Sequence, residues 1–227
     1  MKGRLIGALW IIVALAIFYF GLNGEWFPFF FCICLMMCMA EISAIADLKP
    51  YQVKPSACKP QDAWRFEYTI VYFAAIFCIL LKKEELLLVI IVCSLSDTGA
   101  FTCGKLFGRH KAWFISGISP NKTIEGFIGG IVFTLLAIPV CYLLKITITP
   151  ALIIYLLLGG IAAEIGDLLG SATKRQLQIK DSGDGIRNMP VFKLIEYPIR
   201  GHGGYLDRMD SISLNIVLFT IIMVPQA

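Results

Sequence analysis

Apolar residues fall into seven runs along the chain, separated by polar segments. The runs cover Leu5–Leu22, Trp26–Ala40 with an extension to Ala46, Tyr68–Leu81, Leu86–Cys103, Phe127–Leu144, Pro150–Gly170 and Ile212–Val224. A helix that crosses a bilayer needs about 20 largely apolar residues, and most of the runs approach this length. The pattern predicts an all-α polytopic membrane protein, a bundle of about seven transmembrane helices.

Composition supports the same class. The chain is 58% apolar and 16% charged, whereas soluble domains average about 45–50% apolar and about 25% charged. The eight cysteines form no C-x-x-C pair, which leaves zinc and dithiol sites without support. The first run could also be a signal peptide, but it is long for one and no small-x-small cleavage pattern follows it. A retained first span is therefore expected.

The basic residues predict the orientation. With the amino terminus in the cytoplasm and seven spans, 17 of the 20 Lys and Arg residues are cytoplasmic, and only Lys82, Lys83 and Lys145 are outside. This is the bias of the positive-inside rule. The two most polar regions, Asp97–Gly130 and Glu164–Ser211, then share the cytoplasmic side, where nucleotides are. We expect residues 1–95 to form amino-terminal helices with a cytoplasmic loop, residues 96–227 to form a catalytic region, and the protein to lie in a bacterial inner membrane.

A polar stripe marks the sixth run. Glu164 and Asp167 are three residues apart and share one helix face, and carboxylates within an apolar run suggest function by default. Ser171 and Lys174 continue the stripe. Asp167 could hold a divalent cation while Lys174 and Arg175 bind phosphate. Alternatively, an Asp–Lys ion pair could merely neutralise buried charge, and the stripe alone does not decide between the two.

Further acidic and basic residues follow this run. Asp207 and Asp210 are again three residues apart, and Asp181 lies between them and the stripe. Mg²⁺ prefers oxygen ligands, commonly carboxylates with substrate phosphates, so these side chains suit it, and nearby Lys and Arg suit phosphate. His202 lies among glycines. It could act in acid–base catalysis or simply bond the backbone of a tight loop, because a lone His is a weak signal.

The earlier polar region begins with a break in the fourth run at Ser96–Ala100. A basic, glycine-containing loop follows, then a helix start at Ser119-Pro120, with Glu125 opening the fifth run. No Walker-type G-x-x-x-x-G-K-[ST] sequence is present, which excludes a P-loop. Taken alone, the segment is an ordinary basic cytoplasmic loop.

Together, these segments resemble the phosphatidate cytidylyltransferase (CDP-diacylglycerol synthase) family. Its signature is matched by Ser171-Ala172-Thr173-Lys174-Arg175, Lys180-Asp181-Ser182-Gly183 and His202-Gly203-Gly204-Tyr205-Leu206-Asp207-Arg208-Met209-Asp210, and its upstream elements by Ser96–Ala100 and Ser119–Gly126. The resemblance covers about half of the chain. It departs from the family pattern between Asp181 and His202, where about Asp184–Tyr197 forms an insertion. The insertion could be a small flap over the site, or it could alter substrate access or disable the enzyme.

The resemblance implies the reaction of CTP with phosphatidate to give CDP-diacylglycerol and pyrophosphate. It implies Mg²⁺, with or without a second cation, because both reactants are anionic. The catalytic residues it implies are Asp167, Lys174, Arg175, Lys180, Asp181, His202, Asp207, Arg208 and Asp210, of which Asp167, Asp207 and Asp181 would bind metal. The residues that the resemblance implies for shaping the CTP pocket are Asp97, Lys105, Ser119, Lys122, Glu125 and Ser171. The expected partners are CTP, phosphatidate and the bilayer. A homodimer is considered, and no nucleic acid is expected.

Three other functions fit parts of the sequence. A CDP-alcohol phosphotransferase is disfavoured because Asp184-Gly185-Ile186-Arg187-Asn188 does not continue into its Asp-Gly-x-x-Ala-Arg pattern. A CTP-dependent lipid kinase would use the same nucleotide and metal. An ion-coupled transporter could use Asp97, Glu164 and Asp167 as intramembrane ligands, but charges at span ends on one side favour an interfacial enzyme.

Overall fold

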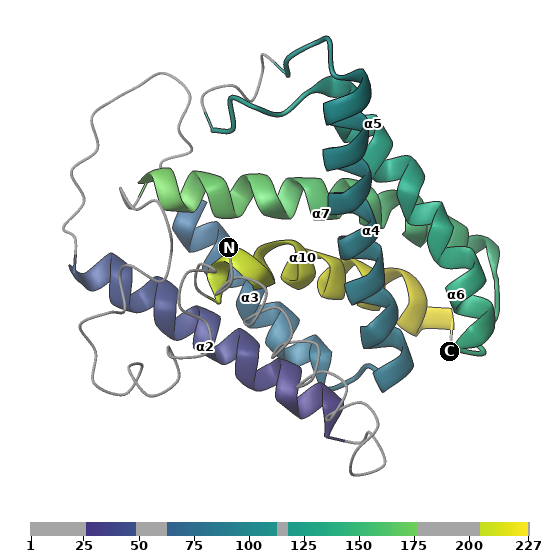
Figure 1. Ribbon diagram of the computed structural model, residues 1–227. Coiled ribbons are helices and arrows are strands. Elements are labelled where there is room, and N and C mark those ends of the chain that lie inside the picture. Colours follow the sequence, from purple (N-terminus) through teal and green to yellow (C-terminus); the bar gives the residue numbers. More distant parts are fainter. Residues whose placement is uncertain (1–25, 49–62, 113–117, 177–204, 227) are drawn as a thin grey trace, which may run out of the picture.

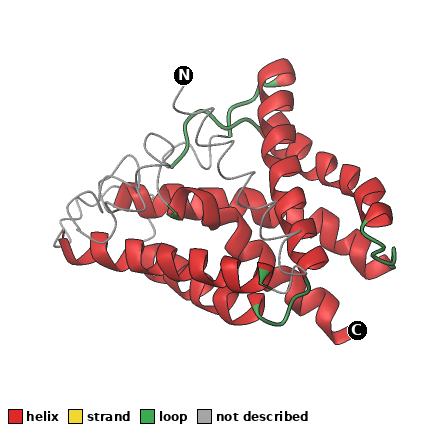
Figure 2. Cartoon of the chain, turned by 60° about the horizontal axis from the view of Figure 1, so that its bottom comes forward, coloured by secondary structure: helices red, strands yellow, loops and turns green. Residues whose placement is uncertain are grey.

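Helices account for nearly all of the chain that the computed structural model describes, which is residues 26–48, 63–112, 118–176 and 205–226. They are α2 (Phe27–Leu48), α3 (Ala63–Cys78), α4 (Lys83–Phe107), α5 (Ile124–Phe133), η3 (Thr134–Ala137), α6 (Ile138–Leu143), α7 (Pro150–Gln176), α10 (Leu206–Met223) and η4 (Val224–Gln226). Within these ranges there is no strand (Figure 2), only an isolated bridge between Lys111 and Thr123. The predicted all-α class is confirmed.

Among the residues that the structure describes, three helical segments are long and apolar enough to cross a membrane: α4, the continuous stretch Ile124–Leu143, and α7. The chain is therefore an integral membrane protein. The first predicted span, Leu5–Leu22, lies outside the described residues.

Helix α4 contains the whole of the predicted fourth run, Leu86–Cys103. Helix α4 continues through Ser96–Ala100 to Phe107. The hydroxyls of Ser94 and Thr98 donate to carbonyl oxygens four residues earlier, at 2.9 and 2.7 Å. Because these polar side chains bond to their own helix, they do not interrupt it.

Two helix pairs organise the bundle. Helices α7 and α10 lie side by side, with α3 and α2 beside them, and α4 packs against α5 and crosses α7 (Figure 1). Glycines allow the close approaches, as is common between membrane helices. A methyl group on Gly99 of α4 would lie 2.6 Å from the carbonyl oxygen of Gly129 on α5, and one on Gly166 of α7 would lie 2.7 Å from that of Asp210 on α10.

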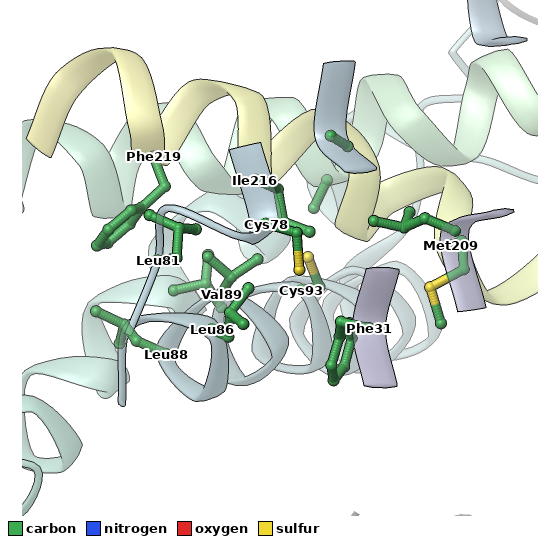
Figure 3. Close-up of a cluster of buried hydrophobic side chains, with 14 of the residues drawn as sticks. Phe31, Cys78, Leu81, Leu86, Leu88, Val89, Cys93, Met209, Ile216 and Phe219 are labelled. Carbon is green, nitrogen blue, oxygen red and sulfur yellow. The ribbon is translucent and has the colours of Figure 1, made fainter. Parts of the chain in front are cut away.

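The interior is an apolar cluster contributed by several helices. Leu81, Leu86, Val89, Ile216 and Phe219 meet where α3, α4 and α10 converge (Figure 3). The outward faces also carry large apolar side chains, among them Phe101, Leu106, Ile128, Val132 and Leu136. Such faces suit lipid contact, because hydrocarbon is the expected solvent for a spanning helix.

Candidate active site

A pocket of about 500 Å³ lies between the carboxyl-terminal half of α4, the loop that precedes α5, and α7. Its lining consists of Asp97, Ala100, Phe101, Gly104, Lys105, Ser119, Asn121, Lys122, Thr123, Gly126, Phe127, Glu164 and Asp167. Four of the residues expected to shape a CTP pocket are included, namely Asp97, Lys105, Ser119 and Lys122. The structure thus brings both polar regions of the sequence together at one hollow.

Lys122 is held between two carboxylates of α7. Its Nζ atom lies 2.6 Å from Oε2 of Glu164 and 2.8 Å from Oδ2 of Asp167. The Glu164 side chain is 3% exposed and that of Asp167 is 40% exposed. Burial lowers the pKa of Lys122, but the two carboxylates outweigh this effect and the pKa is raised. Lys122 is therefore charged at neutral pH and neutralises the acidic end of the stripe.

Backbone hydrogen bonds to the segment that follows α4 hold the loop that carries Lys122 in place. The Ala112 amide donates to the Lys122 carbonyl at 3.0 Å, and the Ile124 amide donates to the His110 carbonyl at 3.0 Å. The Thr123 hydroxyl caps α5 by accepting from the Gly126 amide at 3.1 Å, as N-cap residues do. The backbone around Lys122 is consequently tied down on both sides.

Glu125 lies beside the pocket and is absent from its lining. Its carboxylate accepts from the His110 amide at 3.1 Å, and its Oε1 atom lies 2.7 Å from Nδ1 of the same histidine. Glu125 therefore supports the loop of Lys122 from outside, and this is how it could shape the pocket.

A second charged group lies farther along α7. The Lys174 ammonium pairs with the Asp207 carboxylate, which begins α10, and both side chains are largely buried. Asp210 is buried one turn later, and its Oδ1 atom accepts from the Ser211 amide at 2.7 Å. Lys174 is seven residues beyond Asp167, roughly 10 Å along the helix. Lys174 thus pairs with Asp207 of α10 and not with Asp167 of its own stripe.

The remaining signature residues of the described part surround this pair. Ser171 is half-buried one turn before Lys174, Arg175 is exposed in the last turn of α7, and Arg208 is half-buried beside Asp207. Lys180, Asp181 and His202 lie outside the described residues, as does the insertion at about Asp184–Tyr197. The roles expected of them stay predictions.

The carboxylates offer the donor set that Mg²⁺ requires, although the described residues contain no group of three or more His, Cys, Asp or Glu side chains gathered for a metal. The ammonium of Lys122 occupies the position between the Glu164 and Asp167 carboxylates. Carboxylate oxygens are also the hard ligands that Mg²⁺ prefers. The carboxylates are of the ligand type that suits Mg²⁺, and magnesium binding by them stays a prediction.

Two buried glutamates outside the pocket are not singled out by the sequence pattern. Glu41 of α2 is fully buried and its Oε2 atom accepts from the Leu206 amide at 2.8 Å. Glu67 of α3 is 2% exposed, and neither of its carboxylate oxygens has a hydrogen bond of good geometry in the described part of the chain. Glu41 lies in the extension of the second apolar run, which is the signal that singled out Glu164. Glu67 directly precedes the third run and carries no such signal.

Known proteins share these segments. The family model described as "Cytidylyltransferase family" matches residues 68–225. The phosphatidate cytidylyltransferase of Staphylococcus haemolyticus is 39% identical over 140 residues, which make up 60% of this chain and 47% of that protein. The enzyme of that name from Staphylococcus epidermidis is 40% identical over 133 residues, 57% of this chain and 45% of that protein. This chain spans about half the length of these curated relatives.

No solved structure matches the chain. The matched range 68–225 nevertheless contains the whole pocket, the Lys122 ion pairs and the Lys174–Asp207 pair. From the agreement between this range and the geometry, we conclude that the chain belongs to the cytidylyltransferase family.

Proposed function

We propose that the protein is a phosphatidate cytidylyltransferase, which converts CTP and phosphatidate into CDP-diacylglycerol and pyrophosphate in phospholipid biosynthesis. The observation that carries this proposal is the pocket in which Lys122 meets Glu164 and Asp167, because segments far apart in the sequence supply its cationic and anionic groups. The names of the relatives agree with it.

The pocket suits a nucleotide in size and chemistry. Small-molecule sites commonly have about 300–1,000 Å³, with apolar walls and a few polar groups, and this pocket of about 500 Å³ is within that range. Lys105 and Lys122 supply positive charge for a triphosphate, and Ser119 supplies a hydroxyl. Phe101 and Phe127 supply aromatic faces for a base.

In the proposed reaction, a phosphate oxygen of phosphatidate bonds to the α-phosphorus of CTP. The bond from that phosphorus to the oxygen bridging the α- and β-phosphates breaks, and pyrophosphate leaves. Lys122, Lys174, Arg175 and Arg208 would neutralise the meeting anions, since electrostatic stabilisation dominates such transfers. Magnesium, held by Asp167 and Asp207 together with Asp181, would neutralise further phosphate charge. A second cation bound at the same site would add to this neutralisation.

The lipid substrate would enter sideways from the bilayer. Phe101 and Leu106 of α4 and Ile128 of α5 are exposed apolar side chains on the two helices that border the pocket.

The membrane topology proposed with this route has seven spans. The amino terminus and the active-site loops lie on the cytoplasmic side of a bacterial inner membrane. The bias of basic residues supports it. In this proposal, residues 1–95 form the amino-terminal helices and residues 96–227 form the catalytic region. The proposed assembly of the protein is a homodimer.

The position of a label tests this function. Purified protein in phosphatidate-containing nanodiscs is given CTP labelled on the α- or the γ-phosphate, with Mg²⁺. A cytidylyltransferase transfers the α-label to lipid and releases the γ-label in pyrophosphate. A CTP-dependent lipid kinase would transfer the γ-label to lipid, and a transporter would turn over neither. Either of the last two results would overturn the proposal.

A further inference from the structure

We propose that Glu41 of α2 is a positioning residue that holds the first turn of α10, and through it Asp207, for the reaction. The inference rests on the proposed function. It also gives a role to a helix that precedes the range matched by the family model, which begins at residue 68.

The first amide of α10 depends on Glu41. The opening amides of a helix have no acceptor within the helix, and Tyr205 at the N-cap provides no side-chain hydrogen bond. The amides of Arg208 and Met209 turn back to the Tyr205 carbonyl, at 3.1 and 3.0 Å. The Leu206 amide instead donates to Oε2 of Glu41, at 2.8 Å. A carboxylate of another helix therefore caps α10.

The bond is enclosed and electrostatically favourable. Glu41 and Leu206 are both fully buried, so water does not compete for the amide. An acceptor oxygen at a helix amino terminus meets the positive end of the helix dipole, so Oε2 of Glu41 stabilises the amino-terminal end of the α10 backbone. The Glu41 carboxylate thus fixes where the backbone of α10 starts.

Asp207 follows Leu206 directly and pairs with Lys174 of α7. A shift in the first turn of α10 would move this carboxylate relative to Lys174 and to the lipid and nucleotide phosphates. Glu41 is absent from the lining of the pocket between α4, α5 and α7. Loss of its bond should therefore impair turnover while CTP binding is largely preserved, a pattern that general destabilisation would not produce.

The test uses the full chain in phosphatidate-containing nanodiscs and two variants of similar side-chain length. Glu41→Met removes the acceptor, whereas Glu41→Gln keeps a carbonyl oxygen that can accept from Leu206. Glu84→Gln, in the first turn of α4, is the matched control. Amide hydrogen exchange of a peptide covering residues 205–211 reports on the first turn of α10, and steady-state kinetics report kcat and the KM for CTP.

For Glu41→Met we expect exchange in residues 205–211 to rise by about tenfold or more, with unchanged exchange in α4. We expect kcat to fall on the order of 10- to 100-fold, while the KM for CTP changes by less than about threefold. Glu41→Gln should stay within about threefold of the parent protein in kcat, and Glu84→Gln should match the parent.

Unchanged exchange in Glu41→Met would overturn the proposed anchor. Faster exchange with unchanged kcat would overturn its role in the reaction, as would a loss in Glu41→Gln equal to that in Glu41→Met. If Glu41→Met unfolds the protein, Glu41→Asp replaces it, and the same local exchange and kcat criteria apply. A parent protein that makes no CDP-diacylglycerol would refute the proposed function, whereas the exchange comparison would still decide whether Glu41 anchors α10.

Discussion

The Nζ atom of Lys122 lies 2.6 Å from the Oε2 atom of Glu164, so the loop before α5 is joined to the buried centre of α7. Helix α5 passes close to the carboxylate of Glu164. A methyl group on the adjacent Gly130 would lie 2.8 Å from its Oε1 atom, which shows how tightly α5 covers the carboxylate. Lys122 thus supports the fold and also supplies charge to the pocket.

Replacing Lys122 with Met should damage both stability and activity. It leaves the Glu164 carboxylate buried without its cation, and removing one partner of a buried ion pair costs about 3–5 kcal/mol. Loss of a phosphate-binding cation should also lower kcat/KM for CTP by about 100-fold. Thermal unfolding in detergent and pyrophosphate release measure the two effects.

The double variant Lys122→Met, Glu164→Gln separates these effects. It should recover most of the lost stability, because the buried charge is gone, while activity stays low. Lys83→Met, a change at the opposite end of α4, serves as the control and should leave both quantities near those of the parent. Full activity in the double variant would show that Lys122 acts only as a counter-ion.

The pair of Lys174 and Asp207 should be more than a structural bridge. Asp207→Asn is expected to reduce kcat by about 100-fold or more, and to raise the Mg²⁺ concentration needed for half-maximal activity. Both effects follow if the carboxylate also binds the metal. Pyrophosphate release measured over a Mg²⁺ titration gives both values.

An exchange of the two charges is the sharper control. Lys174→Asp combined with Asp207→Lys keeps an ion pair between α7 and α10, so thermal stability should exceed that of Asp207→Asn alone. Turnover should remain low, because the metal ligand is now on the wrong helix. Recovery of turnover in the exchanged protein would contradict the metal assignment for Asp207.

Glu125 should affect nucleotide affinity from outside the pocket. Glu125→Ala removes the acceptor of the His110 amide and frees the segment that holds the Lys122 loop. We expect the KM for CTP to rise by about tenfold with a smaller change in kcat. Glu125→Gln keeps an acceptor oxygen and should lie between the parent and Glu125→Ala. A fall in kcat with unchanged KM would instead point to direct contact with the reacting groups.

Much of this arrangement could be predicted from the sequence because it depends on local spacing. The three-residue separation of Glu164 and Asp167 predicts that they share one face of a helix. The basic residues predict that both polar regions lie on the same side of the membrane. The structure brings Asp97, Lys105, Ser119 and Lys122 to the same pocket as Asp167. Their meeting agrees with the predicted partnership of the two regions.

Pairings between distant segments could not be predicted in this way. Lys174 continues the stripe of Asp167, yet its partner is Asp207 of α10, and the partner of Asp167 is Lys122. Which charges pair depends on how α7 packs against α5 and α10, and one sequence does not encode that packing in any local period. The cap that Glu41 provides for α10 is hidden for the same reason.

The contact between α7 and α10 yields a last prediction, at Gly166. A methyl group there would lie 2.7 Å from the Asp210 carbonyl oxygen, and this backbone atom cannot turn aside as a side chain could. Gly166→Ala should therefore force the two helices apart, at a cost of about 1–3 kcal/mol, and should lower activity by shifting Asp207 away from Lys174.

Gly104→Ala is a matched control for stability. Its methyl group would lie 3.2 Å from the Thr123 hydroxyl oxygen, a distance that a small side-chain movement relieves. Alanine also favours a helix over glycine by up to about 1 kcal/mol, so the two effects should nearly cancel. Thermal unfolding of both variants checks this difference. Equal stability of Gly166→Ala and the parent would mean that α7 and α10 do not pack as closely as the structure has them.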